Sequence, residues 1–130
     1  MKVSELEGAA LDYWVAKAEG LPLADPPIAD GFVRFNYQAE GLRIRDASHW
    51  SPSTNWAQGG PIIERKNICI TRWRGEDGYQ AYADAYNSND GVEGANYEIC
   101  LEGVGPTMLI AAMRSCVASV FGEEVPQLTT

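Results

Sequence analysis

Apolar residues recur at helical spacing near the start of the chain. Positions i, i+3, i+4 and i+7 are filled by Leu11, Trp14, Val15 and Ala18, which gives a helix one apolar stripe. We predict a helix that begins at Ser4 or Glu7 and ends at Glu19. Gly20 suits the C-terminal cap of this helix, and Pro22 prevents it from continuing.

A second apolar stripe lies near the other end of the chain. Its members are Leu109, Met113, Cys116, Val117 and Val120, and Ala111, Ala112 and Ala118 are small enough to let a neighbour pack closely. This pattern predicts a helix that begins at Gly105-Pro106-Thr107 and ends at Gly122. The tail that follows, residues 123–130, is expected to fray.

Between the two helices, alternation of apolar and polar residues predicts strands. The clearest hairpin joins Ile68–Arg74 to a returning strand at Tyr79–Tyr86 through a Gly-Glu-Asp-Gly turn. Phe32–Tyr37 and Leu42–Arg45 are candidates for a second hairpin. The alternation over Tyr97–Glu102 predicts one more strand.

Three segments have a less regular pattern. Residues 21–31 contain three prolines and are expected to form a connector. Residues 49–58 are rich in Ser, Thr, Asn and Trp, which indicates an ordered loop or a short helix opening at Ser53. In residues 59–67 we expect Pro61 to take the first position of a helix, because its missing N–H would be unpaired there anyway.

Together these elements predict one α+β domain that spans residues 1–130. Strands enclosed by helices at both ends of a short chain favour a helix–sheet–helix (α–β–α) sandwich with a small antiparallel sheet. That arrangement buries the two helical stripes and the hairpin against one another.

Charge divides the chain into three parts. The net charge is −8, and it is made up of −4 over residues 1–33, +4 over residues 34–75 and −8 over residues 76–130. The overall balance argues against nonspecific DNA binding, which needs a basic face. The basic middle part either solvates one face of the protein or lines a site for an anionic ligand.

The composition gives no indication of a cofactor, a metal or a membrane segment. Cys69, Cys100 and Cys116 are odd in number and lack metal-ligand spacing, and His49 is the single histidine. The start of the chain is acidic where a signal peptide would be basic, and the longest strongly apolar run, Met108–Met113, is too short to span a bilayer. A cytoplasmic protein is therefore expected.

Two motifs resemble a known family. They are SPSTNWAQGGPIIER at residues 51–65 and GPTMLIAAMR at residues 105–114, supported by GAALD at residues 8–12. Together they resemble the NinX-like family of small phage and prophage proteins, and they are similar to the phage ABA-sandwich domains. The resemblance implies a phage accessory protein with an α–β–α sandwich and no assigned catalytic residues. It leaves out residues 21–46, which have the character of a variable insertion.

The same two motifs suggest a ligand site. Each Gly-Pro pair is interpreted as a helix start, where unpaired backbone N–H groups and the helix dipole receive an anion. Glycines let a ligand approach the backbone, guanidinium groups suit phosphate, and Trp50, Trp56 or Trp73 could stack on a base. We expect a site for a small anionic, nucleotide-like ligand formed by Ser53, Thr54, Asn55, Trp56, Gly59, Gly60, Arg65, Thr107 and Arg114.

Other interpretations of these residues stay open. The Gly-Pro pairs are common helix-starting chemistry, Trp56 could belong to the core, and Arg65 could pair with a carboxylate. The GGPI sequence lacks the GK[ST] ending of a phosphate loop. No nucleophile has a base at a recognisable spacing, so an enzyme is not expected.

An interaction with a host protein is the alternative function. The acidic final part would then present a field that blocks a basic partner, as a DNA mimic does. The residues that would provide this field are Glu76, Asp77, Asp84, Asp90, Glu93, Glu98 and Glu102. The number of aromatic residues in so short a chain also leaves a homodimer open.

Overall fold

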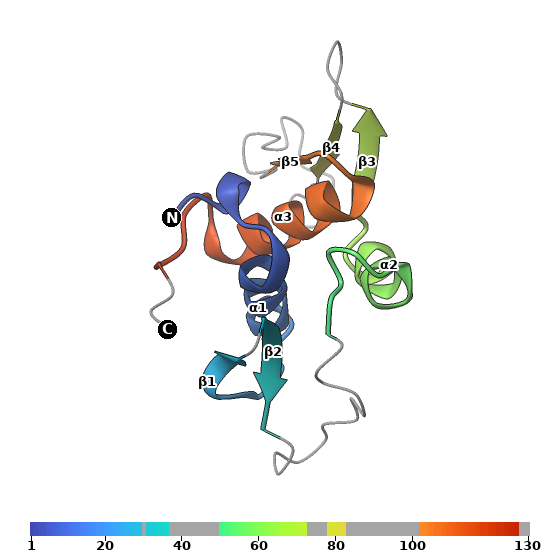
Figure 1. The fold of residues 1–130 in the computed structure, drawn as a ribbon. Coiled ribbons are helices and arrows are strands. Elements are labelled where there is room, and N and C mark those ends of the chain that lie inside the picture. Colours follow the sequence, from blue (N-terminus) through green and yellow to red (C-terminus); the bar gives the residue numbers. More distant parts are fainter. Residues whose placement is uncertain (30, 37–49, 73–77, 83–101, 128–130) are drawn as a thin grey trace, which may run out of the picture.

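The computed structural model describes residues 1–29, 31–36, 50–72, 78–82 and 102–127 (Figure 1). In chain order its elements are a 3₁₀ helix η1 (Val3–Glu5), α1 (Gly8–Ala18), β1 (Leu23–Ala29), β2 (Phe32–Phe35), α2 (Trp56–Arg65), β3 (Cys69–Arg72), β4 (Tyr79–Tyr82), β5 (Glu102–Gly105) and α3 (Met108–Phe121).

The α1–α3 pair lies between two small antiparallel sheets. A three-stranded sheet of order β3-β4-β5 packs against α3, and α3 crosses α1 on its other side (Figure 1). The β1-β2 sheet contacts α1, while α2 packs beside α3. The predicted α+β class, with terminal helices and a small antiparallel sheet, is confirmed, and its strands are divided over two sheets.

Helix α3 is the centre of the hydrophobic core. Its residues from Ala111 to Ala118 are all buried, because α1 and the three-stranded sheet cover different sides of the helix. The sheet can approach closely because Gly103 faces the helix. A Cβ at Gly103 would lie 2.1 Å from the carbonyl oxygen of Ala111, so no other residue fits there without moving the backbone.

Both terminal helices have the expected ends. Gly20 and Gly122 follow α1 and α3 with φ angles of 73° and 88°, a left-handed conformation that glycine adopts without strain. The Thr107 side chain caps α3 by accepting a hydrogen bond from the Ile110 amide. One prediction is wrong: Val120 is 46% exposed. The last turn of α3 packs through Phe121 instead, whose ring meets that of Trp14 at 5.3 Å.

The strand predictions are confirmed in part. β3 and β4 form the predicted hairpin, with Ile70 paired to Ala81. The connector prediction for residues 21–31 is wrong, because β1 pairs with β2 there. The register is irregular between Leu23 and Ile28, and such an irregular two-stranded pair tolerates prolines that a regular ladder excludes. The predicted strands at 42–45 and 97–101 lie outside the described residues, and residue 102 begins β5.

Helix α2 begins earlier than predicted. Asn55 caps it by accepting a hydrogen bond from the Ala57 amide, so Pro61 lies inside the helix and not at its first position. The predicted helix opening at Ser53 is therefore closer to the observed start of α2 than the predicted start at Pro61 is. The cap and the apolar face of the helix outweigh the loss of one backbone hydrogen bond at Pro61.

Residues 123–125 also differ from the expected frayed tail. The Val3 amide donates to the Glu123 carbonyl at 2.9 Å, and the Val125 amide donates to the Met1 carbonyl at 2.9 Å. The Val125 side chain is buried in the core. Both ends of the described chain are therefore joined beside α3.

Candidate functional site

A buried carboxylate on α1 fixes the turn that precedes α2. Asp12 Oδ1 accepts a hydrogen bond from the Ser53 amide at 2.9 Å. The backbone carbonyl of the same residue accepts one from Trp50 Nε1 at 3.0 Å. The turn is closed further by the Ser51 amide, which donates to Gln58 Oε1 at 2.6 Å. Residues 51–55, which include three of the nine predicted site residues, are thus held by α1.

Asp12 is buried, with 5% of the residue exposed. This burial raises the pKa of its carboxyl above the ordinary value of 3.8. The backbone amide and side chain of Ser53 favour the charged form and oppose that rise without cancelling it. The Ser53 hydroxyl lies near the carboxylate but has no hydrogen-bond partner within the described part of the chain. It is therefore a buried polar group with unused bonding capacity.

A groove of about 450 Å³ separates the start of α2 from the start of α3. We call it the α2–α3 groove. Its lining residues are Ser53, Thr54, Trp56, Tyr79, Pro106, Thr107, Met108, Leu109 and Ile110. Four of the nine predicted ligand residues, Ser53, Thr54, Trp56 and Thr107, meet here although they come from two motifs about fifty residues apart.

The α2–α3 groove combines an aromatic wall with a helix N-terminus. Trp56 is 53% exposed, so the interpretation of this residue as core is wrong. Thr107 Oγ1 accepts the Ile110 amide at 3.1 Å, whereas the amides of Met108 and Leu109 have no hydrogen-bond partner among the described residues. Unpaired amides at a helix start attract anions. No lysine or arginine of the described residues lines this groove.

The two glycines of the GGPI sequence have different surroundings. A Cβ at Gly59 would lie 2.5 Å from the Pro52 carbonyl oxygen and 2.6 Å from Leu109 Cδ2, whereas nothing lies within 4 Å of a Cβ at Gly60. Gly59 thus lets α2 pack against the preceding turn and α3. Asn55, the residue before α2, is exposed and acts as its N-terminal cap.

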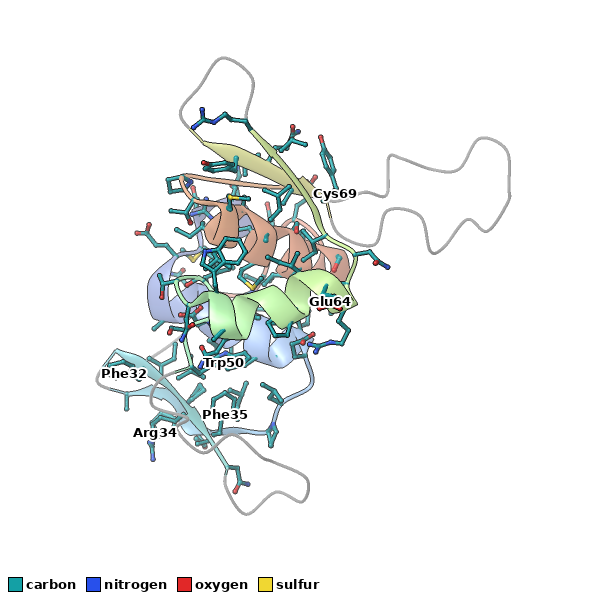
Figure 2. The ribbon with its side chains drawn as sticks, turned by 90° about the vertical axis from the view of Figure 1, so that its right-hand side faces the viewer. Phe32, Arg34, Phe35, Trp50, Glu64 and Cys69 are labelled. Atoms are coloured by element: carbon teal, nitrogen blue, oxygen red, sulfur yellow. The ribbon has the colours of Figure 1, made fainter. Side chains whose placement is uncertain are left out.

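Arg65 lies at the far end of α2, away from the α2–α3 groove. It forms an ion pair with Glu19, as the alternative interpretation predicted. It lines a different hollow together with Trp50. Figure 2 shows Trp50 below α2 and close to Phe35 of β2, and the two rings meet edge to face at 5.9 Å. Trp50 is thus engaged by protein groups, and Trp73 lies outside the described residues.

Arg114 occupies a third place. Its side chain donates from Nε to the Leu6 carbonyl at 2.9 Å and from Nη1 to the Val104 carbonyl at 2.7 Å. It lines a cavity that shares no lining residue with the α2–α3 groove. The nine predicted residues therefore do not form one site.

The positive charge of the middle part does not gather at the α2–α3 groove. Arg34 is exposed on β2, Arg72 lies over the Tyr79 ring at 5.8 Å, and Lys66 follows α2. Arg43, Arg45 and Arg74 lie outside the described residues. Sequence reasoning missed Tyr79 and Met108 as groove residues, because only the fold brings β4 and the start of α3 beside α2.

No group of three metal-ligating side chains occurs within the described residues. Cys69 is exposed on β3 and Cys116 is buried in α3; both are free, while Cys100 and His49 lie outside the described part. Among the helices of the described ranges, none has the length and apolarity needed to cross a membrane.

Comparison with known proteins places the chain in a family. No curated protein is significantly similar to it. The family model described as bacteriophage P22 NinX matches residues 2–120, which include both sequence motifs, α1, α2 and all of α3 except its last residue. This match covers nearly the whole chain, and the expected resemblance is confirmed: the chain belongs to the bacteriophage P22 NinX family.

Proposed function

We propose that this phage protein is a non-enzymatic binding protein that holds a small anionic, nucleotide-like ligand in the α2–α3 groove. The observation that carries the proposal is the meeting of a half-exposed Trp56 with the start of α3 in one groove of about 450 Å³. That volume is within the range of small-molecule sites, about 300–1,000 Å³. Acting in the host cytoplasm, such a protein would sequester its ligand and counter a host defence.

Each part of the ligand has a candidate partner. The indole of Trp56 offers a flat surface on which a base can stack, with Tyr79 and Met108 in the same lining. The unpaired amides of Met108 and Leu109 suit one anionic oxygen group. Because no described lysine or arginine lines the groove, we expect a ligand with few negative charges, such as a cyclic mononucleotide or dinucleotide.

The test is a panel of nucleotides and cyclic oligonucleotides added to the full chain. A ligand that binds the native state raises the melting temperature by mass action, and the rise depends on its concentration. Quenching of Trp56 fluorescence follows the same binding event. Trp56→Ala should abolish the rise, whereas Val120→Ala, which removes another exposed apolar side chain at the far end of α3, should keep it.

A panel without any concentration-dependent rise in melting temperature would reject the proposal. Chromatography of the same samples tests whether a ligand is turned over, and a product that accumulates with time would make the protein an enzyme. Gel filtration with and without ligand tests whether the chain forms a homodimer, which the sequence leaves open.

A host-protein partner is the second candidate, and the exposed Trp56 and Met108 favour it. Both are large apolar side chains at the rim of one groove, 53% and 37% exposed, a composition typical of the centre of a protein interface. Six of the seven acidic residues expected to block such a partner lie outside the described residues, and the seventh, Glu102, begins β5. This candidate is favoured if no compound of the panel binds and the chain captures a host protein that the Trp56→Ala variant does not capture.

A further inference from the structure

A second cavity lies beside α3, and no residue of α2 lines it. It measures about 270 Å³ and is bordered by the start of the chain, β5, α3 and the segment that follows α3. We call it the Arg114 cavity. Its lining residues are Lys2, Val3, Ser4, Gly103, Val104, Arg114, Ala118, Glu123 and Glu124. None of them lines the α2–α3 groove.

Arg114 brings an incompletely bonded guanidinium to this cavity. The residue is 8% exposed. Its Nε and Nη1 donate to the carbonyls of Leu6 and Val104, but Nη2 has no partner among the described residues. Each guanidinium nitrogen of this kind carries N–H donors that favour an oxygen acceptor. The backbone carbonyls hold the fork in place, and its third nitrogen is left for another group.

The positive charge of Arg114 also lacks a close counter-charge. The described residues place no carboxylate within ion-pair distance of it, although Glu7 acts on it from farther away. Burial lowers its pKa, since a charged guanidinium is poorly stabilised away from water. Nη2 itself keeps some exposure, so an anion can reach it and supply the acceptor that it lacks.

The other charges of the Arg114 cavity have both signs. Lys2 contributes a second positive charge, and Glu123 and Glu124 contribute two negative charges, so the four charged lining residues sum to zero. Lys2 and Glu124 are neighbours across a β-bridge. Neither they nor Glu123 forms an ion pair with a described residue. A ligand with one negative and one positive group matches this lining better than a simple anion.

The size and the apolar lining of the cavity limit that ligand further. The volume of about 270 Å³ is below that of common drug-sized or nucleotide sites. Val3, Val104 and Ala118 supply an apolar part that suits a short aliphatic side chain. Both charges must lie within a few bonds of each other to fit, a condition that a free amino acid meets and an internal or terminal residue of a peptide does not.

We propose that the Arg114 cavity binds a small aliphatic amino acid. Its carboxylate accepts hydrogen bonds from Arg114 Nη2 and from the Lys2 ammonium, and its own ammonium group faces Glu123 and Glu124. The ligand ties the start of the chain and residues 123–124 to β5 and α3. This site is independent of the α2–α3 groove, so the two proposals can fail separately.

The experiment titrates L-alanine, acetate and ethylamine separately into the full-length chain and follows backbone amide shifts by NMR. L-alanine should give a saturable shift at residues 2–4, 103–104 and 123–124, while acetate and ethylamine each bind at least about tenfold more weakly, since each lacks one of the two charges. The dissociation constant for L-alanine should not change when the α2–α3 groove variant Trp56→Ala is used.

Two variants identify the groups that bind. Arg114→Lys keeps the positive charge but loses the planar fork, and we expect it to weaken L-alanine binding at least about tenfold. Lys2→Gln changes an exposed side chain, so it should fold normally and weaken binding by about two- to fivefold. Arg34→Gln is its matched control, because it removes one exposed positive charge on β2, on the other side of α1. It should leave binding unchanged.

The proposal is overturned if L-alanine gives no saturable shift, or if acetate binds as tightly as L-alanine. It is also overturned if Lys2→Gln and Arg34→Gln weaken binding equally, since the effect would then come from net charge alone. If Arg114→Lys does not fold, the Lys2→Gln and Arg34→Gln pair and the three-ligand comparison still decide the matter.

Discussion

The carboxylate of Asp12 accepts a 2.9 Å hydrogen bond from the backbone amide of Ser53, 41 residues further along the chain. Both residues are buried, at 5% and 1% exposure. This bond joins the middle of α1 to the turn that leads into α2. Because that turn supplies Ser53, Thr54 and Trp56 to the α2–α3 groove, Asp12 positions the groove without lining it.

Replacing Asp12 by alanine should therefore destabilise the protein. Asp12→Ala leaves the buried Ser53 amide without an acceptor, which costs about 1–3 kcal/mol of the free energy of unfolding. Asp12→Asn retains an acceptor oxygen and should cost less. Urea unfolding measures both, with Glu64→Ala as the control, since Glu64 is an exposed carboxylate on α2 (Figure 2). Equal losses for Asp12→Ala and Glu64→Ala would show that the bond contributes nothing to stability.

The stability of the protein should also depend on pH through Asp12. Burial raises the pKa of this carboxyl in the native state above 3.8, so the native state binds the proton more tightly than the unfolded chain. The contribution of Asp12 to stability is then greatest below pH 3.8 and is lost as the pH rises through the raised pKa.

Asp12→Asn isolates this effect, because the asparagine does not titrate. The free energy of unfolding of the natural chain minus that of Asp12→Asn should fall as the pH is raised from about 3.8. Urea unfolding of both proteins at a series of pH values measures the difference. A difference that grows with pH would mean that the hydrogen bond from the Ser53 amide outweighs burial.

The helices could be predicted from the sequence because their stabilising pattern is local. The stripe of Leu11, Trp14 and Val15 and the capping residue Thr107 act within one or two turns. The β1 strand could not, because Pro26 and Pro27 argue against a strand, and its pairing with β2 depends on contacts with α1. The division of the strands into two sheets is likewise set by tertiary packing.

The candidate site was predictable only in part, for a related reason. A motif shows which residue types are present, but not which way each turn of a helix faces. Trp56 and Arg65 stand in the same helix, yet Trp56 lines the α2–α3 groove and Arg65 pairs with Glu19 at the other end. Arg114 was assigned to the start of α3 by its place in the motif, although it lies in the second turn and is bonded to Leu6 and Val104.

The two adjacent glycines of α2 should respond in opposite ways to alanine. Gly59→Ala places a methyl group 2.5 Å from the Pro52 carbonyl oxygen, and relieving that overlap should cost about 1–3 kcal/mol of stability. Gly60→Ala meets no atom within 4 Å and replaces a poor helix former by a good one, so it should stabilise by up to about 1 kcal/mol. Thermal and urea unfolding of the pair measure both effects, and a destabilising Gly60→Ala would point to a different conformation of α2.

The ion pair between Arg65 and Glu19 should contribute little to stability and nothing to ligand binding. The Arg65 side chain is 59% exposed, whereas that of Glu19 is 10% exposed, so water and salt screen much of their attraction. A double-mutant cycle of Arg65→Ala and Glu19→Ala should give a coupling below about 1 kcal/mol that decreases as salt is added. The melting-temperature rise caused by a ligand of the α2–α3 groove should be the same for Arg65→Ala as for the natural chain, because Arg65 lies at the other end of α2. Loss of that rise in Arg65→Ala, together with its retention in Trp56→Ala, would move the binding site to the hollow that Arg65 shares with Trp50.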